Sequence, residues 1–146
     1  MPYICKPNVA KIILQILKAI MHKPRELLNI IVKKEIDEEF GVPFIEAFED
    51  VFGEAYDKEQ YIATGICCSL FLSSIIKGFP TEKLHTYVRC VRETYPLIVF
   101  NCNKYDELYN RMEETSLSLM DKDLTFHRIE TGKSDILEAF DFVTNG

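Results

Sequence analysis

The chain has 146 residues, which suits one domain with an ordinary hydrophobic core, and its apolar share of 47% and charged share of 27% are those of an average globular protein. Its formal net charge of -6 at pH 7 excludes the overall basic footprint of a nucleic-acid-binding protein. Its 5 cysteines include no Cys-x2-Cys pair, which argues against a secreted disulfide framework and favours reduced thiols in the cytosol or nucleus.

The N-terminal segment is basic and predicts two helices. Residues 1–34 hold seven bases and one acid. A first helix begins near Asn8, a favourable N-cap. A second begins at Pro24, which suits a first helical position, and ends near Gly41. We expect these helices to expose a basic face made by four lysines: Lys11, Lys18, Lys33 and Lys34.

An aromatic ladder follows, with one ring at every fourth position. The rings are Phe40, Phe44, Phe48, Phe52 and Tyr56. Residues 35–59 also hold ten acids against one base. A four-residue step is close to the helical period, so it places rings on one side of a helix and carboxylates on the other. Because Gly41 and Pro43 interrupt the chain, we expect a short helix that ends near Gly53 and in which only the middle three rings share a face.

Two interpretations of this short helix remain open. Its rings are typical of a buried helix face, which leaves the acidic residues in solvent. Alternatively, rings and acids together line an acidic groove that accepts a basic amphipathic helix from a partner. The candidate partner-binding residues are Phe44, Glu46, Phe48, Glu49, Asp50 and Phe52.

The segment from about 58 to 77 predicts the central helix of the fold. Between Gln60 and Ile76 it contains no charged side chain. A helix that is apolar on every side is buried by other helices or by lipid, and the serines and cysteines make this one too polar for a membrane span. A stripe of small residues on it predicts the close approach of a neighbouring backbone. The stripe consists of Gly65, Ser69 and Ser73.

The second half of the chain predicts shorter helices and two ambiguous segments. Helices are expected to begin at Thr81, near Asn103 and near Ser134. The second of these fades around residues 115–120, and its Glu107 and Arg111 are spaced for a surface ion pair. Residues 96–100 predict either a short strand or a kinked helix, and residues 124–130 an extended or loop segment.

Together these elements predict an all-α fold over residues 1–146: a single-domain bundle of six to eight helices around the hydrophobic central helix. A short helical-repeat stack of the HEAT or armadillo kind is the alternative, because consecutive helix pairs would suit it equally well.

Residues that could carry chemistry are dispersed. The three histidines are isolated, and the six glycines form neither Gly-x-Gly nor a phosphate-binding loop. We therefore expect no metal and no cofactor. The remaining route to catalysis is a pairing formed only by folding, of Cys90 or Cys102 with His85 or His127.

Three functional hypotheses follow. The leading one is a non-enzymatic helical interaction domain, an adaptor, scaffold or regulatory module, that binds a partner helix or peptide, above all a basic amphipathic helix. The second is a small enzyme with the Cys and His site. The third is binding of RNA or of a membrane surface through the basic N-terminal helices, which the acidic net charge disfavours.

Overall fold

The structure is a computed structural model that describes residues 40–123 and 125–145, without the side chains of Cys90 and Thr94. Within these residues, five α-helices and one β-hairpin follow each other along the chain. The helices are α3 (Val42–Phe52), α4 (Lys58–Lys77), α5 (Thr81–Thr94), α6 (Tyr105–Arg111) and α7 (Lys133–Asn145). The strands of the hairpin are β1 (Ser116–Met120) and β2 (Phe126–Glu130). Short 3-10 turns, Gly53–Ala55 and Cys102–Lys104, precede α4 and α6.

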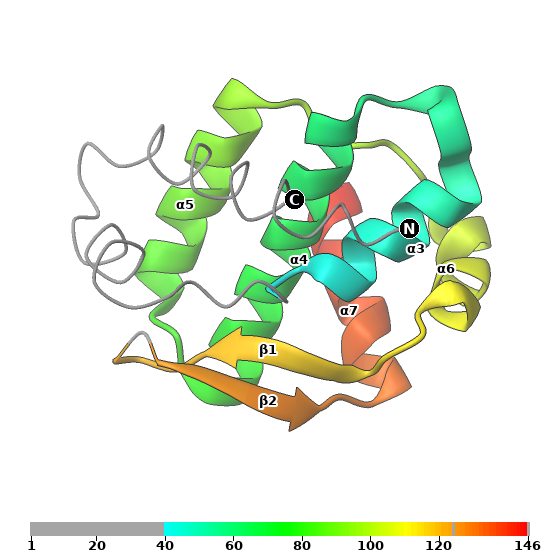
Figure 1. The fold of residues 1–146 in the computed structure, drawn as a ribbon. Helices are drawn as coiled ribbons and strands as arrows, with labels where there is room; N and C mark the ends of the chain where they lie inside the picture. The colour runs from blue at the N-terminus through cyan, green and yellow to red at the C-terminus, as the bar shows by residue number, and fades with distance from the viewer. Residues whose placement is uncertain (1–39, 124, 146) are drawn as a thin grey trace.

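Helix α4 occupies the middle of the fold. Figure 1 shows α5 on one side of it, α3 and α7 on the other, and the hairpin across one end. The backbone N–H of Asp57 donates to Gln60 Oε1 at 3.2 Å before the first turn, and Gly78 ends the helix with a φ of 82°. The predicted central helix is confirmed with its bounds.

The burial of α4 accounts for its apolar composition. Among the described residues, α4 is the one helix whose length and composition would suit a membrane span. In this structure, 67% of its most apolar stretch is buried inside the fold, where helices and β1 cover it.

The small-residue stripe of α4 meets its neighbours as the sequence predicts. A Cβ atom on Gly65 would stand 2.6 Å from Ile45 Cγ1 and 3.1 Å from Gly41 O, so the start of α3 could not approach a larger residue as closely. Further along the stripe, Ser73 Oγ accepts a 2.9 Å hydrogen bond from the backbone N–H of Met120 in β1. The predicted close approach is confirmed at these two positions.

Aromatic rings join helices α3 and α7 and the segment 97–100 into one core. Phe44 and Phe48 of α3 are fully buried, with 0% of each exposed. The ring centroid of Phe140 in α7 lies 5.9 Å from that of Phe44 and 6.1 Å from that of Phe48. The Phe100 ring lies 5.7 Å from Phe48. Offset and edge-on contacts of this kind each contribute about 0.5–1.5 kcal/mol beyond the area they bury.

The hairpin corrects the expectation of an all-α fold. Strands β1 and β2 pair antiparallel, with Leu117 opposite Ile129 and Leu119 opposite His127. Residues 116–120, where the sequence predicts a fading helix, form β1, and the ambiguous segment before Glu130 forms β2 from residue 126 onward. The strand is stable here because β1 is buried between β2 and α4 rather than exposed as a lone extended segment.

The other predicted elements have mixed outcomes. A mostly helical fold is confirmed, and α7 begins one residue before the predicted cap at Ser134. Residues 96–100 form neither helix nor strand and run from α5 toward the turn before α6. The helices predicted to begin at Asn8 and Pro24 lie outside the described residues.

Candidate functional site

Helix α3 separates its rings from its acids. The helix starts after Gly41, whose φ of 81° lies in the left-handed region that glycine adopts readily, and Pro43 lies in its first turn. Phe44 and Phe48 are four residues apart and point into the core. The acidic residues lie on the opposite face, with Glu46 and Asp50 exposed and Glu49 half-buried. The helix therefore supports a row of carboxylates on a rigid aromatic base.

These carboxylates border a hollow of about 440 Å³ between α3 and the C-terminal end of α6 with the residues just after it. We call it the acidic hollow, and it is lined by Glu46, Glu49, Asp50, Arg111 and Glu113. Four of the five lining residues are carboxylates, so the hollow carries a net negative charge.

One ion pair lies within the acidic hollow, and another joins it to Lys58 at the start of α4. Arg111 Nη1 lies 2.6 Å from Asp50 Oδ2, and Lys58 Nζ lies 3.1 Å from Glu49 Oε2. The hydrogen bond to Asp50 raises the pKa of the Arg111 guanidinium, so this residue stays a cation. All four side chains are substantially exposed, so solvent screens both pairs and each contributes little to stability. A cationic side chain of another molecule can therefore replace Arg111 or Lys58 in these pairs with little loss of free energy.

The structure divides the predicted partner-binding residues. Glu46, Glu49 and Asp50 lie together on the acidic hollow. Phe44 and Phe48 lie in the core, so a partner cannot touch these rings in this structure, and Phe52 is half-buried against Phe100 at a centroid distance of 5.8 Å. The rings thus hold the helix in place, while the carboxylates face solvent.

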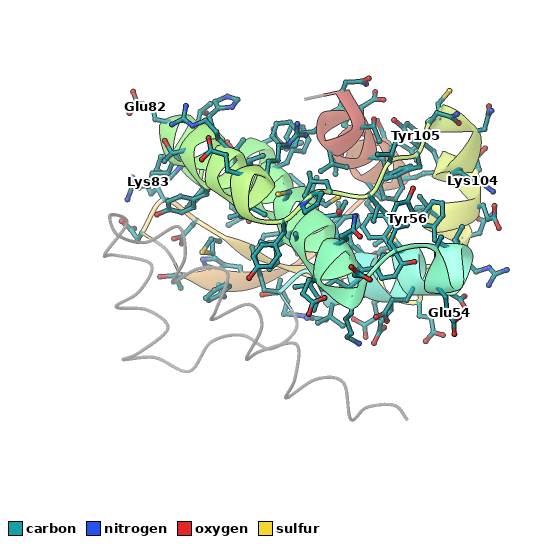
Figure 2. All side chains as sticks on the ribbon, turned by 90° about the horizontal axis from the view of Figure 1, so that it is seen from above. Glu54, Tyr56, Glu82, Lys83, Lys104 and Tyr105 are labelled. Carbon is teal, nitrogen blue, oxygen red and sulfur yellow. The ribbon has the colours of Figure 1, made fainter. Side chains whose placement is uncertain are left out.

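The aromatic ladder ends beyond α3. Figure 2 shows Glu54 at the outer edge of the molecule, near the end of α3, and Tyr56 nearer its middle. The hydroxyl of Tyr56 donates a 2.8 Å hydrogen bond to the backbone carbonyl of Val99. Tyr56 therefore anchors the extended segment 97–100 rather than continuing the face of Phe44 and Phe48.

Arg111 and Glu113 belong to the acidic hollow although no local sequence pattern predicts them there. The sequence predicts that Arg111 pairs with Glu107 one helical turn earlier. Instead Arg111 pairs with Asp50, which is 61 positions away in the chain, and Glu107 pairs with Lys104 at 3.5 Å. No local sequence pattern signals a contact over such a separation, because it depends on how α6 packs against α3.

The predicted pairing of a cysteine with a histidine is not formed among the described side chains. Cys67 and Cys68 are fully buried in α4, and burial raises the pKa of the Cys67 thiol to about 12. Cys102 is exposed, and His127 pairs with Asp121 at 2.6 Å between Nε2 and Oδ2. Thiols with a raised pKa stay protonated at neutral pH, so the two buried ones are poor nucleophiles.

Two other expectations concern the basic N-terminal face and metal binding. The basic face formed by lysines 11, 18, 33 and 34 lies outside the described residues, as does the side chain of Cys90. Within residues 40–123 and 125–145, no three His, Cys, Asp or Glu side chains are grouped so that they could hold a metal ion.

Comparison with known proteins finds a short region of sequence similarity. No protein-family profile matches the chain, and no solved structure matches it. A 3-dehydroquinate synthase from Parabacteroides distasonis is 45% identical to it over 51 residues. The aligned stretch is 35% of this chain and 14% of the length of that protein. The likeness is thus confined to a minor part of both chains.

Proposed function

We propose that the chain is a non-enzymatic helical interaction domain whose acidic hollow binds a basic segment of a partner protein. One observation carries this proposal: four carboxylates from two distant parts of the chain, Glu46, Glu49, Asp50 and Glu113, border the same hollow with a single lining base, Arg111. Such a surface attracts Lys-rich and Arg-rich segments and disfavours acidic ones.

The partner that fits best is a basic amphipathic helix. Its cations would replace the exposed pairing of Arg111 with Asp50, while its apolar face would pack on partly buried side chains near the end of α3, Val51 and Phe52. The domain would act as an adaptor, scaffold or regulatory module in the cytosol or nucleus. The buried rings of α3 support this role because they keep the carboxylates in a fixed row before the partner arrives.

The test is a binding titration with a synthetic amphipathic peptide of leucine and lysine that carries a fluorescent label. The variant combines Glu46→Lys with Asp50→Lys, and the matched control combines Glu82→Lys with Glu138→Lys, two exposed acids on α5 and α7. Both double variants change the net charge equally. We expect the first to weaken binding about tenfold or more, which is about 1.4 kcal/mol, and the control to change it little.

Circular dichroism checks that both double variants keep the helical fold. Equal weakening by the two would mean that the peptide responds to net charge alone and would contradict binding at the acidic hollow. Equally tight binding of a leucine and glutamate peptide would contradict the charge complementarity on which the proposal rests.

A further inference from the structure

A second hollow lies at the end of the fold where α5, the segment 97–100 and the last turn of α7 meet. Its volume is about 320 Å³, and its lining consists of Arg92, residues 97–100, Val143 and Thr144. We call it the Arg92 hollow. It shares no lining residue with the acidic hollow, and its one charged lining residue is a base.

Arg92 is half-buried and only partly satisfied. Its Nη2 donates a 3.1 Å hydrogen bond to the backbone carbonyl of Val143 in the last turn of α7. Its Nε is buried and has no hydrogen-bond partner among the described residues. No described carboxylate forms an ion pair with this guanidinium. A buried donor on a charged group is costly to leave unpaired, so the arrangement favours an added anion.

One structural role of Arg92 is already clear. A cation at the C-terminal end of a helix interacts favourably with the helix dipole, and a guanidinium can also bond the last carbonyls. That role uses one of the five N–H donors of Arg92, the one that reaches Val143. No further hydrogen bond of this guanidinium is found among the described residues, and its side chain lines an open hollow.

The apolar wall of the Arg92 hollow is fixed before any ligand arrives. The backbone N–H of Ile98 donates to Thr64 Oγ1 at 3.0 Å, and the Val99 carbonyl accepts from the Tyr56 hydroxyl at 2.8 Å. These bonds hold residues 97–100 in one extended conformation. Val99 is nevertheless 77% exposed, which leaves a large apolar side chain in solvent at the rim of the hollow.

We propose that the Arg92 hollow binds a small organic monocarboxylate with an apolar body. A carboxylate accepts two parallel N–H bonds from a guanidinium, and no other side chain matches that geometry as well. An apolar body would cover Leu97 and Val99, which line the hollow beside Arg92. The volume is near the lower end of the range of small-molecule sites, roughly 300–1,000 Å³, so the ligand must be small. This binding activity goes beyond the interaction function proposed for the acidic hollow.

The experiment titrates the whole chain with hexanoate and, in parallel, with hexanamide, and follows backbone amide shifts by NMR. We expect saturable shifts for hexanoate that centre on residues 97–100 and on the end of α7. Hexanamide has the same body without the charge, so it should bind about tenfold more weakly or worse, because hydrogen bonds to a charged group are the stronger ones. Equal binding of the two ligands, or no saturable shift at this hollow, would overturn the proposal.

Three variants locate the site. Arg92→Gln should weaken hexanoate about tenfold or more, whereas Arg89→Gln, on the same helix and exposed, should leave it unchanged. Val99→Asp keeps Arg92 and changes an exposed side chain, so it retains the fold and should weaken hexanoate by repulsion and by competition for the guanidinium. If Arg92→Gln fails to fold, Val99→Asp is the deciding variant, because an unchanged affinity of Val99→Asp for hexanoate would refute the site.

A further titration distinguishes a small-molecule ligand from the C-terminus of a peptide. A tetrapeptide with a C-terminal leucine carries the same carboxylate and apolar body, and its amidated form lacks the charge. We expect the peptide to bind no more tightly than hexanoate, because the hollow offers a short apolar wall and few further polar contacts. Binding of the free-acid peptide about tenfold tighter than hexanoate would overturn the assignment to a small molecule.

Discussion

Ser73 shows how one small polar side chain joins two parts of the molecule. It is fully buried in α4, and its hydroxyl donates to the Ser69 carbonyl at 2.7 Å. The same oxygen accepts the backbone N–H of Met120 at 2.9 Å, so it satisfies a strand group that points away from β2. Ser73 is also the last member of the small-residue stripe, and its size lets β1 approach α4. A single hydroxyl thus attaches the hairpin to the central helix.

Replacing Ser73 by alanine should destabilise the fold although alanine is the better helix former. The change leaves the Met120 N–H buried without an acceptor, so we expect the free energy of unfolding to fall by about 1–3 kcal/mol. Urea denaturation followed by circular dichroism measures it. The control is Ser74→Ala, because Ser74 is half-buried and, among the described residues, its hydroxyl makes a single long contact of 3.4 Å with Thr81 Oγ1. Equal losses in the two variants would contradict the role of the Met120 bond.

At the scale of elements, the helices of the described residues were predictable and the hairpin was not. The bounds of α4 follow from its uncharged interior and its flanking caps, Asp57 and Gly78, which are local features of the sequence. Strand β1 has five residues and is buried along most of its length, so it lacks the alternation that marks a half-exposed strand. It forms because β2 and α4 cover it, and that covering is a property of the whole fold.

The turn of the hairpin depends on an ionised carboxylate. Asp121 Oδ1 accepts the backbone N–H groups of Asp123 at 2.8 Å and Thr125 at 3.0 Å, and Oδ2 bonds to His127 Nε2 at 2.6 Å. The backbone bond from Thr125 and the bond from His127 lower the pKa of Asp121 from 3.8 to about 2. Relative to the protonated form, the ionised carboxylate of Asp121 is therefore more stable in the folded chain than in the unfolded chain.

This depressed pKa predicts how the stability of the hairpin changes in acid. Because the folded pKa is below the unfolded one, the contribution of Asp121 is fully present above its ordinary pKa of 3.8 and is lost as the pH falls through about 2. Asp121→Asn keeps an oxygen for the two backbone bonds and removes the charge. We expect wild type to exceed this variant in free energy of unfolding at pH 6, and the difference to shrink as the pH falls from about 4 toward 2.

Urea denaturation across that pH range measures the difference, and Asp123→Asn in the same turn is the control. Asp123 contributes its backbone N–H rather than its carboxylate to the turn, so its replacement should give no such acid-dependent convergence. A wild-type advantage over Asp121→Asn that stays constant across this pH range would show that the charge of Asp121 does not stabilise the fold.

At the scale of the whole molecule, one aromatic core supports two hollows of opposite charge. The acidic hollow lies on the solvent face of α3, and the Arg92 hollow lies where α5, α7 and the segment 97–100 meet. The sequence predicted that the rings and acids of α3 occupy separate faces, because the helical period fixes that locally. It did not predict which residues complete either hollow, since Arg111 and Arg92 reach their partners across 61 and 51 positions of the chain.

Phe140 connects the elements of this aromatic core, so its replacement should destabilise all of them together. It is fully buried, and its ring contacts rings from α3, from α6 and from the segment 97–100. We expect Phe140→Ala to lower the free energy of unfolding by about 3–5 kcal/mol, since it removes the ring and leaves a cavity between several elements. Phe142→Ala is the matched control on the same helix, because Phe142 is half-buried and stacks on Phe71 alone among the described rings, at 4.7 Å.

Chemical denaturation followed by far-UV circular dichroism and by tyrosine fluorescence measures both variants and tests whether the loss is shared. If the core joins the elements, the two probes should give coincident transitions in wild type and in Phe140→Ala, with the midpoint shifted to lower denaturant. Phe142→Ala should lose less than Phe140→Ala because Phe142 is only partly buried and contacts fewer rings than Phe140 does. Separate transitions for the two probes would mean that the elements around the two hollows unfold independently, and an equal loss in both variants would contradict the central role of Phe140.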